Sequence, residues 1–208
     1  MSNRFASRPA HNSRPQRGMA LIEVLVSLVI LSVGLLGLAG VSNRASIAEM
    51  ESYQRVQALE LVQDMANRIN ANRKVASCYS NGSTGVTLGA GSNTIPTCAA
   101  TGSNVQQQTQ AAADLTAWRD MINGQSELQS SSKIGAMVGA IGCVTLDSTT
   151  TIGGNTVNTY LIAVSWQGLA KTAAPLKSGV AFPCGNGSYG DEKLHRVITT
   201  KVQIGVLS

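Results

Sequence analysis

The sequence predicts an α+β fold, in which one long N-terminal helix packs on a small C-terminal antiparallel β-sheet. Helical periodicity runs without a break from about residue 19 to about residue 74. The first half of that run is apolar, and its second half is amphipathic. The last third of the chain alternates apolar and polar residues, which is typical of antiparallel strands with one buried face. With 208 residues, 43% of them hydrophobic, the chain suits one domain with a core of moderate size.

Residues 1–18 are polar and contain two prolines, so we expect a disordered leader. They hold no acidic residue but carry four arginines, Arg4, Arg8, Arg14 and Arg17. Without them the chain has 12 basic and 11 acidic residues, so the formal charge of +5 belongs almost entirely to the leader. A nucleic-acid-binding surface on the body is therefore not expected. The arginines instead favour a cytoplasmic N-terminus by the positive-inside rule.

The apolar half of the helix contains an uncharged run of 18 residues from Val24 to Val41. At ~1.5 Å per residue this run is ~27 Å long, just enough to cross a bilayer. Everything after Arg44 would then lie outside the cytoplasm. Glu23 immediately precedes this run. A bare charge at the centre of a bilayer costs roughly 2.5–3.5 kcal/mol on insertion scales. This carboxylate needs a functional explanation.

The amphipathic half continues to about Lys74, because neither proline nor glycine occurs between Val41 and Ala76. Its apolar residues recur at spacings of three and four and should cover one face of the sheet; they are Leu59, Val62, Met65, Ala66 and Ile69.

The middle of the chain changes in composition. Residues 77–109 are rich in Gly, Ser, Thr and Asn, which favours turns and irregular connections. A short amphipathic helix is predicted over 110–122, with Leu115, Trp118 and Ile122 on one face. The pattern does not determine the fold of 75–140 as a whole.

Three strands are predicted in the last third of the chain. Cys143 to Leu146 is a short strand, and a polar turn follows over 147–155 around Gly153-Gly154. A second strand covers 157–167, and a loop with two prolines leads to a third over 194–206. On this third strand the alternating residues of one face are Leu194, Arg196, Ile198, Thr200, Val202 and Ile204.

Four cysteines fit an exported domain, in which an even number usually pairs. Three connectivities are possible. We expect sequential pairing, Cys78 with Cys98 and Cys143 with Cys184, because each pair brackets a glycine-rich or hairpin-like segment. Each closure would contribute ~3–4 kcal/mol, mainly by restricting the unfolded chain. Free buried thiols are the alternative.

No catalytic, metal-binding or cofactor-binding residues are expected. Outside the leader the only histidine is His195, predicted to be a solvated strand residue and not a catalytic base. The sequence has no G-x-S-x-G elbow, no phosphate-binding G-x-x-x-x-G-K-[ST] and no C-x-x-C. The two tryptophans, Trp118 and Trp166, are expected to pack in the core.

The N-terminal run "RGMALIEVLVSLVILSVGLLGLAG" at 17–40 resembles the signature of type IV prepilins. The resemblance implies that a membrane prepilin peptidase cuts between Gly18 and Met19 and methylates the new amine of Met19. Glu23 is then the fifth mature residue and would pair with the N-terminal amine of another subunit. Met19 replaces the usual phenylalanine, which fits a minor pilin better than a major one.

Secretory signals, lipoprotein signals and ordinary membrane anchors fit this end of the chain less well. A secretory signal cut near "GLAG" at 37–40 would discard the helix, and a lipoprotein signal would need cysteine at Val41. An ordinary single-span anchor gives no reason for Gly18 or Glu23.

Later blocks resemble the minor pilins called type IV pilus modification proteins, PilV; they are "ELVQDMANRINANR" at 60–73, "DLTAWRD" at 114–120, "GCVTLD" at 142–147, "VSWQG" at 164–168 and "RVITTKVQI" at 196–204. The resemblance implies a pilin fold with a leader over 1–18, a transmembrane and assembly helix over 19–42, and the amphipathic helix half with a periplasmic head over 43–208. It also implies a single span in the bacterial inner membrane with a cytoplasmic N-terminus, followed by incorporation into a filament.

The implied partners are prepilin peptidase, other minor and major pilins, and the inner-membrane assembly platform. The implied role is to help start pilus assembly near the tip, with twitching motility or adhesion as the outcome. Two alternatives stay open: a minor pseudopilin of a type II secretion system, and a tip adhesin that binds a ligand through loops 75–113 and 170–192. A membrane-anchored hydrolase would need a base and a nucleophile that the sequence does not present.

Overall fold

A computed structural model of the chain describes residues 19–98, 103–124, 128–129, 132–133 and 137–205. The leader predicted over 1–18 lies outside these residues. The chain forms two compact units, one up to Ser46 and one from Ile47 to the C-terminus, called the head below. Each is described by itself.

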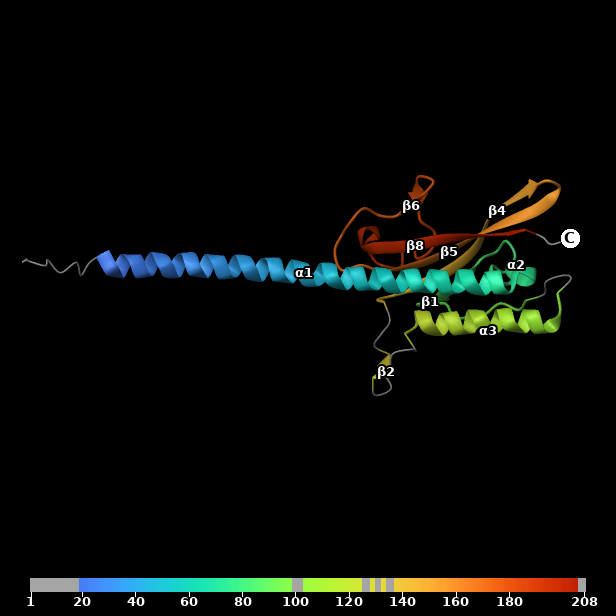
Figure 1. The fold of residues 1–208 in the computed structure, drawn as a ribbon, viewed down its shortest axis with the longest axis horizontal. Coiled ribbons are helices and arrows are strands. Elements are labelled where there is room, and N and C mark those ends of the chain that lie inside the picture. Colours follow the sequence, from blue (N-terminus) through green and yellow to red (C-terminus); the bar gives the residue numbers. More distant parts are fainter. Residues whose placement is uncertain (1–18, 99–102, 125–127, 130–131, 134–136, 206–208) are drawn as a thin grey trace, which may run out of the picture. The chain divides into compact units, whose positions relative to one another are not determined.

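The long helix α1 (Met19–Ala71) runs through both units. It ends three residues before the predicted Lys74, and a 3₁₀ turn, η1 (Arg73–Val75), and the one-turn helix α2 (Ala76–Tyr79) follow. The head therefore begins with the amphipathic half of α1 (Figure 1).

A four-stranded antiparallel sheet forms the centre of the head, in the order β1-β4-β5-β8. The strands are β1 (Val86–Gly89), β4 (Ile141–Ile152), β5 (Asn155–Gln167) and β8 (His195–Gly205). The described residues also form two small hairpins and a 3₁₀ turn, namely β2 (Leu128–Gln129) with β3 (Ser132–Lys133), β6 (Leu176–Lys177) with β7 (Val180–Ala181), and η2 (Glu192–Leu194).

The β4–β5 hairpin is longer than predicted. Its turn is only Gly153-Gly154, both with positive φ, between the paired residues Ile152 and Asn155. The polar turn predicted over 147–155 is thus wrong for residues 147–152, which belong to β4, and for Asn155, which begins β5. Threonines at 149–151 are β-branched and pair with 156–158, so their polarity reflects an exposed strand and not a loop.

The main core lies between α1, α3 (Val105–Ile122) and one face of the sheet. Val62, Met65 and Ile69 of α1 are fully buried there, as predicted. Leu59 was placed wrongly on this face, because it is 44% exposed and the preceding Ala58 is buried in its place. Both tryptophans are buried, Trp118 on α3 and Trp166 on β5, which confirms the expected packing.

Helix α3 begins five residues earlier than the predicted start at 110. Asn104 accepts a hydrogen bond from the Gln107 backbone N–H at 2.8 Å, and the Gln107 side chain accepts from the Asn104 N–H, forming a capping box. The Asn72 side chain at the end of α1 donates to the Gln107 carbonyl at 2.9 Å. The cap therefore also joins the two helices, which lie side by side in Figure 1.

A buried carboxylate fixes α3 against α1 further along. Asp114 accepts hydrogen bonds from Arg68 of α1 at 2.9 Å, from Tyr79 of α2 at 2.5 Å and from Gln110 at 2.9 Å, and it is only 6% exposed. Burial and the bond to Asp114 raise the pKa of Tyr79 well above its ordinary value, so the phenol remains a donor. This network is the main polar link between the helices, and Arg68 also pairs with Asp64.

The other face of the sheet is covered by the loop that joins β5 to β8. A second apolar cluster lies beneath this loop; it contains Ile141, Cys143, Leu161, Ala163, Phe182, Cys184 and Tyr189. The Tyr189 hydroxyl and Ser165 Oγ lie 2.8 Å apart, which ties the loop to β5. Both faces of the central strands are therefore buried.

His195 lies under the same loop, so the prediction of a solvated strand residue is wrong. The residue is 1% exposed, its Nδ1 lies 2.8 Å from Glu192 Oε2, and its ring centroid is 5.1 Å from that of Tyr189. Neither ring nitrogen contacts a serine or cysteine side chain in the described part of the chain.

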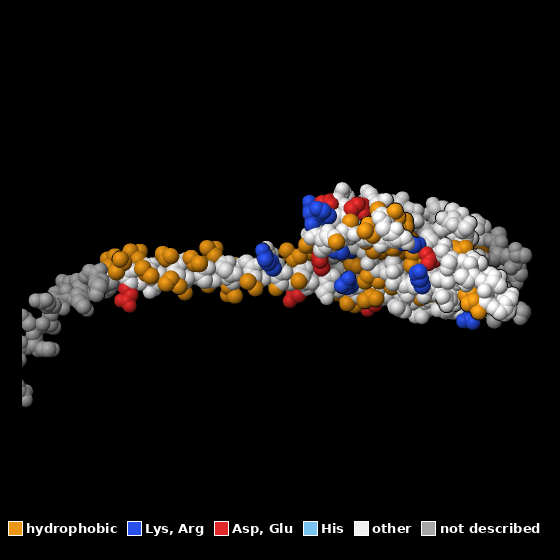
Figure 2. All heavy atoms as spheres, turned by 90° about the horizontal axis from the view of Figure 1, so that it is seen from above, with side chains coloured by type: hydrophobic (Ala, Val, Ile, Leu, Met, Phe, Trp, Pro, Cys, Tyr) orange, Lys and Arg blue, Asp and Glu red, His pale blue; other side chains and the backbone are white. Residues whose placement is uncertain are grey.

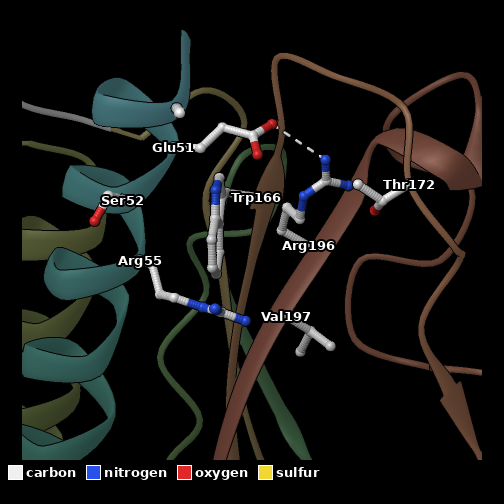
Figure 3. A pocket seen from close by; sticks show the side chains of 8 residues that line it. Glu51, Ser52, Arg55, Trp166, Thr172, Arg196 and Val197 are labelled. Atoms are coloured by element: carbon white, nitrogen blue, oxygen red, sulfur yellow. Dashed lines mark hydrogen bonds and ion pairs between the residues drawn. The ribbon is translucent and has the colours of Figure 1, made fainter. Parts of the chain in front are cut away.

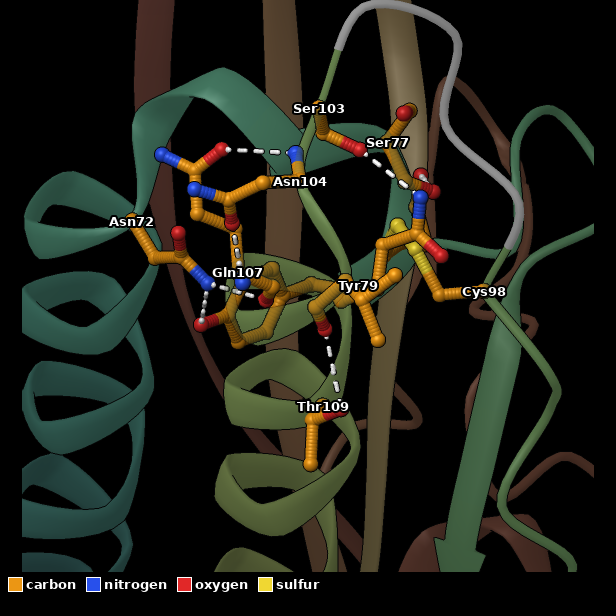
Figure 4. The surroundings of a disulfide bond; sticks show 12 residues. Asn72, Ser77, Tyr79, Cys98, Ser103, Asn104, Gln107 and Thr109 are labelled. Atoms are coloured by element: carbon orange, nitrogen blue, oxygen red, sulfur yellow. Dashed lines mark hydrogen bonds between the residues drawn. A yellow bond between two sulfur atoms is a disulfide. The ribbon is translucent and has the colours of Figure 1, made fainter.

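The disulfides are Cys78–Cys98 and Cys143–Cys184, with Cα atoms 5.1 and 6.0 Å apart. This is the sequential pairing expected from the sequence. The first holds the segment before α3 next to α2, close to the capping box (Figure 4). The second joins β4 to the covering loop, so each bond fastens a segment with little regular structure to the core.

Gly142 on β4 gives α3 room to approach the sheet. A Cβ atom there would lie 2.4 Å from Ile122 Cδ1 and 2.5 Å from Trp118 Cη2, both buried. We expect Gly142→Ala to lower the free energy of unfolding of the head by about 1–3 kcal/mol through overpacking. Urea unfolding monitored by Trp fluorescence measures this change in the free energy of unfolding. Gly205→Ala on β8 is the control, since its Cβ meets nothing within 4 Å; an equal loss in both variants would contradict the packing argument.

Candidate functional site

The first half of α1 presents a continuous apolar surface. The large apolar side chains from Leu21 to Val41 are between 51% and 74% exposed, and within their unit they have nothing to pack against. Figure 2 shows these side chains gathered along the helix. In the described chain, α1 is the one helix long and apolar enough to cross a membrane. Such a surface requires lipid or other apolar helices around it.

Glu23 lies on this surface, one turn inside the start of α1. Its side chain is exposed and lines a shallow hollow with Val24, Ser27, Leu28 and Leu31. It forms no ion pair with any residue that the structure describes. Among the described residues, this carboxylate therefore lies among apolar side chains without a cation to neutralise it.

Of the other two predicted site residues, Gly18 lies outside the described residues and Met19 is the first residue of α1. Cleavage after Gly18 would thus place a new amine at the helix N-terminus, four residues before Glu23. The cleavage and the methylation of Met19 stay predictions.

Three glycines on α1 show what the apolar surface can accommodate. Cβ atoms built at Gly34, Gly37 and Gly40 would meet nothing within 4 Å. Contacts with the described residues therefore do not require their small size. Glycines at spacings of three on an apolar helix allow the backbone of another helix to approach closely.

Catalytic groups are not brought together in the described residues. These residues include no group of three or more His, Cys, Asp or Glu side chains that could hold a metal ion. Buried His195 has a carboxylate neighbour in Glu192 but no adjacent nucleophile in the same described part of the chain.

Sequence reasoning did not find a pocket in the head between α1, β5 and β8. Glu51 Oε1 accepts hydrogen bonds from the backbone N–H groups of Leu169 and Ala170, both at 3.0 Å, and from Arg196 Nη2 at 3.1 Å (Figure 3). Partial burial opposes its ionisation, but the bond from Ala170 and the charge of Arg196 outweigh this and hold the pKa of Glu51 below its ordinary value. The buried indole of Trp166 also lines this pocket.

Space for the Arg196 guanidinium depends on Gly168. A Cβ atom at this glycine would lie 2.7 Å from Arg196 Cζ. No sequence signal pointed to the pocket, because Glu51 and Arg196 are 145 residues apart.

Two family models match parts of the chain. Residues 13–39 match the prokaryotic N-terminal methylation motif, which includes Gly18, Met19 and Glu23. Residues 41–118 match the type IV pilin Tt1218 family, over the amphipathic half of α1 and on to Trp118. No curated protein and no solved structure matches the chain. The methylation motif, the Tt1218 match and the packing of the amphipathic half of α1 on a small antiparallel sheet together show that the chain belongs to the type IV pilin superfamily, a structural family.

Proposed function

We propose that the protein is a minor subunit of a type IV pilus, of the PilV type, which helps to start filament assembly near the tip and thereby supports twitching motility or adhesion. The observation that carries the proposal is Glu23, a carboxylate without an ion pair in the described structure, on an exposed apolar helix within the N-terminal methylation motif. A pilin filament supplies the apolar helices that this surface needs and the amine that this carboxylate lacks.

The proposed sequence of events begins with the precursor. The arginine leader keeps the N-terminus in the cytoplasm and residues 19–42 span the inner membrane, so that residues 43–208, which include the head, lie in the periplasm. Prepilin peptidase removes the leader between Gly18 and Met19 and methylates the amine of Met19. The subunit then leaves the membrane through the assembly platform and joins other minor and major pilins.

Pairing with the amine explains why Glu23 is tolerated in this position. The mature amine of one subunit is positively charged, and a neighbouring Glu23 can neutralise it in the apolar interior of the filament. In lipid the same carboxylate is without this partner. The lower electrostatic free energy of the paired carboxylate favours transfer of the helix from the membrane to the filament.

Mass spectrometry of the protein isolated from its own cells tests the processing. We expect an N-terminus at Met19 carrying one methyl group on the amine, and an intact leader in cells without prepilin peptidase. A mature N-terminus at Met1, or one near Val41 as after secretory cleavage, would reject the proposal.

Since pseudopilins of type II secretion systems share this processing, a gene deletion is needed to distinguish them from pilus subunits. Loss of pili and twitching supports the pilus, whereas intact pili with blocked export of a secreted enzyme would point to type II secretion.

A further inference from the structure

The pocket beside Glu51 has features that its structural role does not explain. Within the head it is lined by Glu51, Ser52 and Arg55 of α1, by Trp166 of β5, and by Thr172 and Arg196 from the loop and β8. Figure 3 shows the indole of Trp166 between Glu51 and Arg55, with Arg196 on the other side of the same space. Helix and sheet packing alone would close such a space with apolar side chains.

The charges in the pocket do not balance. Arg196 neutralises Glu51 and is itself held by the Lys193 carbonyl at 3.0 Å and by the Ala170 carbonyl. Arg55 is exposed and has no hydrogen bond or ion pair with any residue that the structure describes. The pocket therefore retains one uncompensated positive charge, on a side chain that is free to meet an anion.

A buried donor in the same pocket also lacks an acceptor. Trp166 is 3% exposed, and its Nε1–H has no hydrogen-bond partner among the described residues. Trp118 differs, because its Nε1–H donates to the Leu61 carbonyl at 2.9 Å. A buried N–H without an acceptor costs about 1–3 kcal/mol, so a ligand that brings an acceptor to Trp166 recovers that energy.

We propose that this pocket binds an acidic residue of a neighbouring pilin subunit, whose carboxylate pairs with Arg55 and whose peptide carbonyl accepts a hydrogen bond from Trp166. An acidic residue within a chain carries both acceptors, a side-chain carboxylate and a peptide carbonyl, and Ser52 and Thr172 also line the pocket. The proposal rests on the proposed function, since only a filament subunit has pilin neighbours. It adds a contact made by the head to those made by the apolar helix.

NMR spectroscopy of the full chain in detergent micelles, with ¹⁵N-labelled tryptophan, tests the chemistry of the pocket. The probes are N-acetyl-glutamate N-methylamide and its glutamine counterpart. We expect the Trp166 indole resonance to move saturably with the glutamate probe and about tenfold more weakly with the glutamine probe. The Trp118 resonance should stay in place. An unmoved Trp166 resonance, or equal responses to the two probes, would overturn the proposal.

Two variants test whether Arg55 supplies the positive charge that binds the carboxylate of the probe. Arg55→Gln should remove the preference for the glutamate probe, whereas Arg73→Gln, the same change at an exposed position in η1, should keep it. Preference retained in Arg55→Gln would overturn the role of Arg55. The unchanged Trp118 resonance in both variants shows that the head is folded.

A photo-crosslinking amino acid at position 52 in assembled filaments identifies the source of the carboxylate. We expect a cross-linked pilin peptide with Asp or Glu within a few residues of the attachment point, and a yield at least about fivefold lower in Arg55→Gln than in Arg73→Gln. Filaments that contain the protein without this cross-link would overturn the inference and leave the proposed function intact. Absence of the protein from filaments would overturn both.

Discussion

Replacing Glu23 with glutamine is expected to leave the protein in the membrane but to reduce its incorporation into filaments on the order of 100-fold or more. The variant keeps the shape of the side chain but removes the charge, so the neighbouring N-terminal amine would be buried without its partner. Leaving one member of a buried ion pair uncompensated costs ~3–5 kcal/mol, which corresponds to this loss. Quantitative immunoblots of sheared filaments and of inner membranes measure the two populations.

Glu49→Gln is the matched control for this variant. Glu49 is also an exposed glutamate of α1 without an ion pair in the described structure, but it lies in the head and outside the methylation motif. The Glu49→Gln protein should therefore be incorporated into filaments at the normal level. Normal incorporation of the Glu23→Gln protein would contradict the assembly role, and a reduced membrane level in that variant would indicate a defect in insertion instead.

Replacing Asp114 with alanine should produce the largest loss of stability in the head, about 3–5 kcal/mol in the free energy of unfolding. The change leaves Arg68 with only Asp64 and leaves the buried Tyr79 hydroxyl without its acceptor. Urea unfolding followed by the fluorescence of Trp118, which lies on the same helix, reports the loss.

Asp120→Ala provides the comparison for Asp114→Ala. Asp120 pairs with the adjacent Arg119, and the two side chains are 30% and 25% exposed, so its loss should cost less than about 1 kcal/mol. Similar losses in the two variants would show that the network around Asp114 does not hold α3 on α1 as described.

The features that the sequence predicted well depend on local patterns. The apolar run and the alternation in β5 can each be recognised within about twenty neighbouring residues. Strand β1 was missed because it has four residues in a stretch rich in Gly and Ser, where its pairing with β4 and not its composition makes it a strand. The early start of α3 was signalled by Asn104 and Gln107, a capping box that could have been found in the sequence.

The features that the sequence did not predict depend on contacts between distant segments. His195 carries no local sign of burial, and it is buried because the loop fastened by Cys143–Cys184 covers it. Leu59 fits the helical stripe by spacing, but the sheet beneath α1 meets Ala58 instead. The pocket joins α1 to β5 and β8, and its unpaired donor follows from three-dimensional packing alone.

The disulfide-fastened loop also limits how the head can meet other proteins. With α1 and α3 on one face of the sheet and the loop on the other, the flat surfaces of the central strands are inaccessible. The sheet still offers the outer backbone edge of β8, the edge of β4 beyond Val144, where β1 has ended, and the tip of the β4–β5 hairpin. Variation in binding specificity between related heads would therefore be expected in loops, edges and helix surfaces, while the sheet itself acts as an invariant frame.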